Sequence, residues 1–248
     1  MPRYKLTIEY DGSPYAGWQK QQERPSVQAA IEEAVFKFCG NRVEVAGAGR
    51  TDAGVHAMAQ AAHVDLPEAI DPFRIMQGTN FHLFSMEGNR IAITSAEPVP
   101  DDFHARFSAT KRHYLYRIIN RRSRLALEAG RAWHVIEPLD ENAMRQAAEM
   151  LLGHHDFTSF RDSECQAKSP MKTLDQLDIR RQGNEIHIVT SARSFLHHQV
   201  RIMVGTLSLT GKGKWQPKDI KAALEARDRA KAGPTAPPEG LYLVGVEY

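Results

Sequence analysis

Cysteine is scarce in this chain of 248 residues, with only Cys39 and Cys165, which stand far apart and in no CxxC pair. This argues against a disulfide framework or a zinc–thiolate site, and it fits a reducing cytoplasm. No apolar run approaches eighteen residues, so no membrane span is expected. Residues 1–10 enter a strand pattern directly, so no secretory signal peptide is expected either.

Net charge is also small, at +2, which by itself is weak support for a nucleic-acid partner. The chain lacks P-loop, dinucleotide-binding and zinc signatures. Neither His56 and His63 nor His154-His155 has the spacing of a metal-ligand set, so packing or hydrogen bonding is the favoured role of these histidines. We therefore expect neither a cofactor nor a metal.

One stretch, Gly47 to His56, combines three glycines with a cation, Arg50, and a carboxylate, Asp52. The glycines predict a backbone that bends sharply or lets a ligand come close. A carboxylate beside an arginine on such a loop could act as a nucleophile or general base. The alternative is a turn in which Asp52 caps its own backbone while Arg50 is solvated. From spacing alone this second interpretation is favoured.

Basic and aromatic residues gather between positions 111 and 124. The range 111–120 reads as a strand, with Arg112, Tyr114 and Tyr116 on one face. More arginines follow it, among them Arg121 and Arg122. This segment could be a solvated edge strand, or it could bind phosphates and stack a base.

The remaining patterns predict an α+β chain in two parts. The first part has the order strand, helix, strand, strand, helix, strand, which is the ferredoxin-like order, and the second repeats it with insertions. The predicted strands are 3–10, 42–46, 60–66, 89–96, 111–120, 173–181, 185–193 and 241–248. The predicted helices are 26–40, 71–81, 140–152, 195–211 and a short one from 217, with 154–156 as a loop.

Several segments together resemble the TruA family of tRNA pseudouridine synthases. The strongest is Ala48-Gly49-Arg50-Thr51-Asp52-Ala53-Gly54-Val55-His56, which is similar to the family's signature. The others, in the family's order, are 10–12, 17–19, 101–107, 112–114, 157–160, 195–201 and 240–243. The chain departs from the family pattern at Ile202, where a polar residue is usual, and in extra residues up to Gly88. The resemblance nevertheless covers nearly the whole chain.

The resemblance implies two ferredoxin-like halves, residues 1–105 and 106–248, whose antiparallel sheets join into one extended sheet with a central catalytic cleft. It implies a cytoplasmic homodimer that converts uridine to pseudouridine at positions 38–40 of the tRNA anticodon stem-loop. Since the product is an isomer of the substrate, the reaction needs no cofactor and no metal.

The resemblance also implies a role for individual residues. Asp52 would be the catalytic carboxylate, and Arg50 would occupy or stabilise the space vacated by the flipped uridine. Tyr114 would stack on the uracil, and Arg201 would keep Asp52 ionised. The remaining expected contacts are an apolar wall from Leu241 or Leu243 and RNA contacts from Lys111, Arg112, Arg121 and Arg122.

Two other functions are compatible with some of these features. One is a non-catalytic protein that binds and remodels tRNA on the same fold, which an Asn or Ala at position 52 would have favoured. The other is an aspartate-dependent hydrolase, which needs a second carboxylate loop. No second copy of the motif occurs in this chain, although a dimer could supply one.

Overall fold

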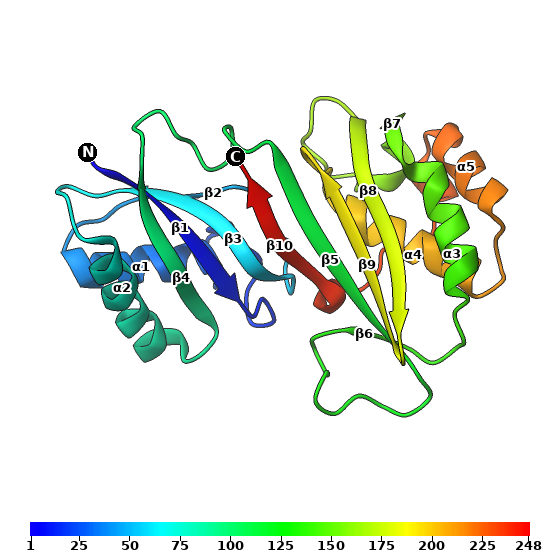
Figure 1. Ribbon diagram of the computed structural model, residues 1–248, viewed down its shortest axis with the longest axis horizontal. Helices are drawn as coiled ribbons and strands as arrows, with labels where there is room; N and C mark the ends of the chain where they lie inside the picture. The colour runs from blue at the N-terminus through cyan, green and yellow to red at the C-terminus, as the bar shows by residue number, and fades with distance from the viewer. The chain divides into compact units, whose positions relative to one another are not determined.

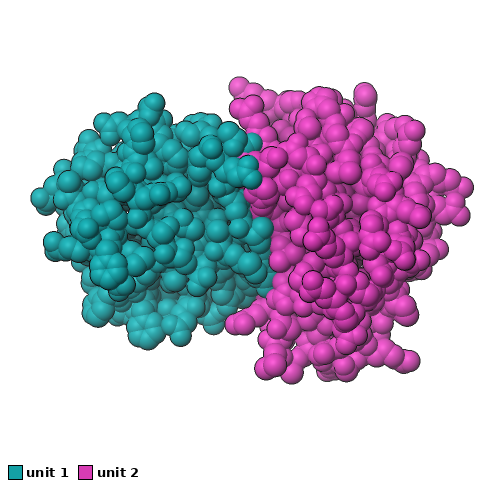
Figure 2. All heavy atoms as spheres, viewed as in Figure 1, with its two compact units in different colours: residues 1–110, 242–248 teal, residues 111–241 magenta.

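The computed structural model describes residues 1–248, which divide into two compact units (Figure 2). The first unit comprises residues 1–110 together with 242–248, and the second comprises 111–241. The predicted second half, residues 106–248, includes the last predicted strand, 241–248. In the structure that strand pairs with a strand of the first unit, and residues 242–248 therefore belong there.

The first unit contains five strands and two helices (Figure 1). They are β1 (Arg3–Tyr10), α1 (Val27–Cys39), β2 (Val45–Gly47), β3 (His56–Asp65), α2 (Pro72–Glu87), β4 (Ile91–Val99) and β10 (Leu241–Glu247). Strand β1 lies between β4 and β3 and is antiparallel to both. The order β1-α1-β2-β3-α2-β4 confirms the predicted ferredoxin-like succession.

Two strands share the outer edge of β3. Strand β2 pairs antiparallel with its far end, Ala62 to Val64, and β10 pairs parallel with its beginning, at His56 and Ala57. The chain between β2 and β3 leaves the sheet at this edge. Because β10 runs parallel to β3, the expectation of a purely antiparallel sheet was wrong at this position.

Local sequence accounts well for β1 and α1. Alternate residues of β1 are buried, as its polar–apolar alternation predicts. The side chain of Ser26 accepts a hydrogen bond from the Ala29 amide and caps α1, and Gly40 ends this helix in the left-handed conformation. Helices α1 and α2 pack closely, since a Cβ atom at Gly78 would overlap the ring of Phe38.

Two elements of this unit differ from their predicted bounds. Strand β2 begins at Val45 rather than at the predicted residue 42, and Arg42 lies outside the sheet, with its guanidinium 4.2 Å from the centre of the Phe36 ring. Helix α2 continues to Glu87 rather than ending at 81, because Leu83 is buried and the Gly88 amide donates to the Phe84 carbonyl.

The second unit contains five strands, three α-helices and four 3₁₀ turns. They are β5 (Lys111–Asn120), β6 (Trp133–Val135), α3 (Glu141–Ala148), η1 (Glu149–Leu151), β7 (Gly153–Asp156), η2 (Thr158–Phe160), β8 (Met171–Gln182), β9 (Glu185–Ala192), α4 (Gln199–Gly211), α5 (Pro217–Ala226), η3 (Arg229–Lys231) and η4 (Pro238–Gly240). The sheet order is β6-β5-β9-β8-β7, in which only the β5–β6 pair is parallel. The predicted α+β class is confirmed.

Strand β5 and the β8–β9 hairpin form as predicted, but two other segments do not. The segment 154–156, predicted as a loop, is part of β7 and pairs antiparallel with β8. Helix α4 begins at Gln199 rather than 195, because His198 adopts the left-handed conformation, with φ of 60°. None of the helices combines the length and the apolar character that crossing a membrane requires.

Candidate active site

The signature segment forms the connection between β2 and β3 in the first unit. Its backbone turns back on itself, since the Val55 amide donates to the Asp52 carbonyl over 3.1 Å. Gly54 has a φ of 76°, which a residue with a side chain rarely adopts. The turn leaves the Arg50 side chain exposed and the Asp52 side chain half-buried.

Thr51, between these two residues, is buried and connects the loop to the rest of the first unit by hydrogen bonds. Its hydroxyl lies 2.8 Å from the Tyr10 hydroxyl, and its carbonyl accepts from the Trp18 amide over 3.1 Å. Only glycine fits at position 17, next to Trp18, because a Cβ atom there would lie 2.5 Å from the Thr51 carbonyl oxygen. Arg50 and Asp52 therefore lie on either side of a residue that is held by hydrogen bonds to Tyr10 and Trp18.

The segments 10–12 and 17–19, which the resemblance had singled out, thus lie beside the signature loop and support it. The Tyr15 carbonyl also accepts from the Gly54 amide, over 3.4 Å. Trp18 is buried, and its ring lies against Gly47.

His56 ends the loop and begins β3. Its Nδ1 atom accepts a hydrogen bond from the Gly12 amide over 3.1 Å and lies 3.4 Å from a carboxylate oxygen of Asp11. The ring stacks on that of Tyr242, in β10, with centroids 4.8 Å apart. His56 is buried, and its contacts connect the loop to the turn after β1 and to β10.

Asp11 has a pKa below its ordinary value. Partial burial alone would raise the pKa, but hydrogen bonds from the Ser13 hydroxyl and amide lower it, and so do the nearby His56 and Arg90. Arg90 donates to the Asp11 carboxylate over 2.9 Å. A fixed negative charge therefore lies beside His56 at the end of the signature loop.

Comparison with known proteins identifies the family. A family model described as tRNA pseudouridine synthase matches residues 6–108 and 147–248. Proteins named tRNA pseudouridine synthase A are similar over the entire chain of 248 residues. They include one from Rhodopseudomonas palustris strain BisA53, 60% identical with 100% of both chains covered, and one from Allorhizobium ampelinum, 58% identical with 95% of the relative covered.

The chain belongs to the TruA family of tRNA pseudouridine synthases. The family is one of isomerases, so the expected class of enzyme is confirmed.

The other predicted substrate contacts lie mostly in the second unit. Tyr114 in β5 is 9% exposed, and its ring meets that of Phe195 edge-to-face with centroids 5.2 Å apart. Arg201 in α4 donates from Nε to the Ala236 carbonyl over 2.9 Å. Leu241 is buried in the second unit and Leu243 in the first, so these two leucines belong to different compact units.

The four predicted RNA-binding residues have very different exposures. Arg112 is only 8% exposed and donates to the Arg193 carbonyl over 2.6 Å, on the same buried face of β5 as Tyr114. Lys111 is half-buried and forms an ion pair of 3.4 Å with Asp175. Arg121 and Arg122 lie beyond the end of the strand, where Arg122 is exposed.

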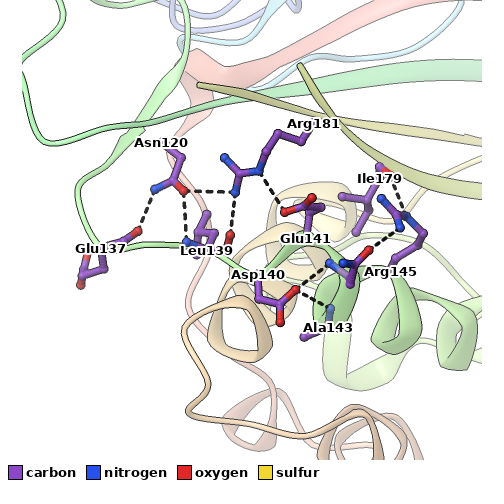
Figure 3. A network of polar contacts seen from close by, with 10 residues as sticks. Asn120, Glu137, Leu139, Asp140, Glu141, Ala143, Arg145, Ile179 and Arg181 are labelled. Atoms are coloured by element: carbon purple, nitrogen blue, oxygen red, sulfur yellow. Dashed lines mark hydrogen bonds and ion pairs between the residues drawn. The ribbon is translucent and has the colours of Figure 1, made fainter. Parts of the chain in front are cut away.

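A polar network fixes the strand end from which Arg121 and Arg122 emerge (Figure 3). Asn120 donates to the carbonyls of Val135 and Glu137 and accepts from the Leu139 amide and from Arg181. Arg181 is held in turn by Glu141, over 2.9 Å. The residue before Arg121 is therefore held by several hydrogen bonds. Arg121 itself donates to the Ser123 and Arg124 carbonyls.

Sequence reasoning missed the residues that support the loop. The sequence places Tyr10 at the end of one predicted strand and Gln60 at the start of another, but it gives no partner for either side chain. The signal available was that a tyrosine or a glutamine, when buried, needs a hydrogen-bond partner. Which partner each finds depends on strand register, and the sequence does not give that register.

Proposed function

We propose that this protein converts uridine to pseudouridine in tRNA, at positions 38–40 of the anticodon stem-loop, with Asp52 as the catalytic carboxylate. Membership of the family supports the reaction and the class of substrate. The observation that carries the assignment of Asp52 is its display on a loop anchored through the adjacent Thr51.

The reaction rearranges bonds without adding or removing atoms. The N1–C1′ bond of the nucleotide breaks, the uracil turns, and C1′ bonds to C5. The proton that leaves C5 is balanced by the one that N1 gains. The chemistry needs a nearby carboxylate and a site that orients the freed base, but neither a cofactor nor a metal. An ionised Asp52 could attack the sugar, attack the base or remove a proton.

Four further residues complete the proposed site. Arg50, exposed beside Asp52, fills or stabilises the space vacated when the uridine leaves its helix, which it must do to become accessible. Tyr114 stacks on the uracil, and Leu241 or Leu243 supplies an apolar wall. Arg201 opposes the loss of charge that burial would impose on Asp52, because a nearby cation stabilises a carboxylate.

Binding of tRNA is proposed to rest on phosphate contacts from exposed basic residues. Arg122, and Arg121 on its anchored turn, are the best placed of the four predicted residues. The small exposure of Arg112 makes it better suited to supporting Tyr114 from the same strand than to binding phosphate. We further propose that the enzyme is a homodimer and works in the cytoplasm.

The decisive experiment compares Asp52→Asn with a control, Glu68→Gln, which alters an exposed carboxylate elsewhere in the first unit. Pseudouridines are mapped in tRNA after incubation with each pure protein. We expect wild type and Glu68→Gln to modify positions 38–40. Asp52→Asn should give no turnover but should bind tRNA within about tenfold of wild type, or about 1.4 kcal/mol.

Two results would contradict the proposal. Multiple turnover by clean Asp52→Asn protein would remove the aspartate from the chemistry. Tight tRNA binding by wild type without any pseudouridine would favour a binding or remodelling protein instead.

A further inference from the structure

Gln60 is a fully buried polar residue in the middle of β3, opposite Ile8 of β1. Its side chain reaches out of the strand to the signature loop, where Nε2 donates to the Gly49 carbonyl over 2.8 Å. The accepting carbonyl belongs to the peptide bond that enters Arg50. Gln60 is not among the residues proposed to contact the substrate.

The other end of the same amide is unsatisfied. Its oxygen, Oε1, is buried and has no hydrogen-bond partner. Turning the amide over would not help, because Oε1 would then face the Gly49 carbonyl and two acceptors would oppose each other. Burying an unpaired carbonyl oxygen is costly, and such groups in native structures call for an explanation.

Packing alone does not explain a glutamine at this position. An unbranched apolar side chain of similar length, such as methionine, would fill the same volume and leave no orphan oxygen. What methionine could not supply is the N–H group that holds Gly49. The function of the residue is therefore to be sought in that hydrogen bond.

We propose that Gln60 is a positioning residue for the active site, which fixes the Gly49–Arg50 peptide and so the direction in which Arg50 leaves the loop. This inference rests on the proposed function. Glycine at position 49 leaves the peptide free to rotate unless something holds it. Thr51 is hydrogen-bonded to Tyr10 and Trp18, and Gly49 is hydrogen-bonded to Gln60, so the residues on both sides of Arg50 are fixed.

The test uses Gln60→Met, which keeps the volume and removes the N–H donor. The matched control is Thr79→Val. Thr79 is also fully buried in the first unit with an unpartnered oxygen, Oγ1, but it lies in α2, away from the loop. Both substitutions remove an orphan oxygen, but only Gln60→Met also removes a hydrogen bond to the loop, so Thr79→Val shows what loss of a buried orphan oxygen does by itself.

We expect both variants to fold and to unfold cooperatively in urea, with a lower midpoint for Gln60→Met than for Thr79→Val, because the Gly49 carbonyl loses its donor. Turnover should separate them: Gln60→Met should lose about tenfold or more in kcat with little change in KM, because the misdirected group acts only in the reacting complex. Thr79→Val should retain the wild-type kcat.

A second measurement does not depend on activity. Trypsin cleaves after exposed arginines whose backbone can open, and Arg50 is exposed on this loop. Cleavage of the Arg50–Thr51 bond in the folded protein should be faster in Gln60→Met than in wild type or Thr79→Val. Gln60→Asn, which keeps the amide but is one methylene too short to reach Gly49, should behave like Gln60→Met.

The outcomes distinguish this inference from the proposed function. If wild type makes no pseudouridine, the proposed function fails, while trypsin still reports whether Gln60 fixes the loop. If wild type is active and Gln60→Met retains both its kcat and its resistance to cleavage, the inference is overturned. Failure of both Gln60 variants to fold would make the residue structural and would equally overturn it.

Discussion

The hydroxyl groups of Tyr10 and Thr51 lie 2.8 Å apart in a buried environment, and they join the end of β1 to the loop that carries Asp52. Tyr10 precedes a turn in the chain, and Thr51 is the residue between Arg50 and Asp52. A hydrogen bond between residues so far apart in sequence makes the position of the loop depend on the sheet behind it.

Tyr10→Phe should therefore destabilise the protein. The change removes one hydroxyl and leaves the buried Thr51 hydroxyl without that partner, which should lower the free energy of unfolding by about 1–3 kcal/mol. Urea denaturation measures the effect. In the double variant Tyr10→Phe/Thr51→Val both hydroxyls are gone, so its loss should be smaller than the sum of the two single losses. Strict additivity would show that the two groups are not coupled.

Replacement of Arg50 tests base flipping. If Arg50 fills the space left by the uridine, it offsets an unstacking cost of a few kcal/mol. Arg50→Ala should then bind folded tRNA without flipping the base, and Arg50→Lys should recover only part of the activity, because lysine lacks the planar guanidinium. A base-analogue fluorophore beside the target uridine measures flipping.

Asp52→Asn is the control for this experiment, since it should flip the base normally. Normal flipping by Arg50→Ala without reaction would give Arg50 a role in the chemistry instead. Full activity of that variant would make Arg50 a solvated loop residue.

The arginines beyond β5 should contribute to the salt dependence of tRNA binding. Each lost phosphate contact reduces the slope of log affinity against log salt by roughly 0.7–0.9. If both residues contact phosphate, Arg121→Ala/Arg122→Ala should flatten the slope by about twice that amount. Arg180→Ala, which removes an exposed arginine from β8, is the control and should leave the slope unchanged. An unaltered slope in the double variant would place the tRNA elsewhere.

Acid should destabilise the protein partly through Asp65. Its carboxylate accepts two hydrogen bonds of 2.7 Å from Arg3, which lower its pKa below the ordinary value despite partial burial. A depressed pKa in the folded state contributes stability above the unfolded pKa of about 3.9, and that stability is lost as pH falls through the folded value. Asp65→Asn lacks this contribution.

Urea midpoints measured between pH 6 and pH 2.5 provide the test. The midpoint of wild type should fall more steeply below about pH 4 than that of Asp65→Asn, so that the two curves converge in acid. Parallel curves over the whole range would show that the ion pair does not contribute to stability.

Elements whose pattern is complete within a few residues could be predicted from the sequence. Strands β1 and β5 have the predicted bounds, because alternation shows which face is buried. The elements that differ depend on distant partners. His154 and His155 belong to a strand because they pair with Thr173 and Lys172 of β8, and β10 joins β3 although the two strands are far apart in the sequence. Neither neighbour can be identified from local pattern.

In the candidate site, too, local sequence features could be predicted and contacts with distant residues could not. Its loop could be found because glycines, a cation and a carboxylate stand together in the sequence. Its supports could not, because Tyr10 reaches the loop through the pairing of β1 with β3, and Gln60 reaches it through the pairing of β2 with β3. Ion pairs and hydrogen bonds across a sheet depend on which residues of neighbouring strands lie opposite each other. The hydrophobic pattern shows only which face of the sheet a residue occupies, and not which residue lies opposite it.

The shared edge of β3 has a consequence for biosynthesis. Strand β2 occupies its far part, and β10 occupies the part next to the loop, where Tyr242 covers His56. A ribosome has to translate the whole second unit before β10 emerges, so the unit begun first is finished last. A nascent chain that stalls in between has its signature loop but not the ring that packs behind it, and long-range pairing of this kind is slow to form. The stacking of Tyr242 on His56 can therefore form only after translation has passed residue 242.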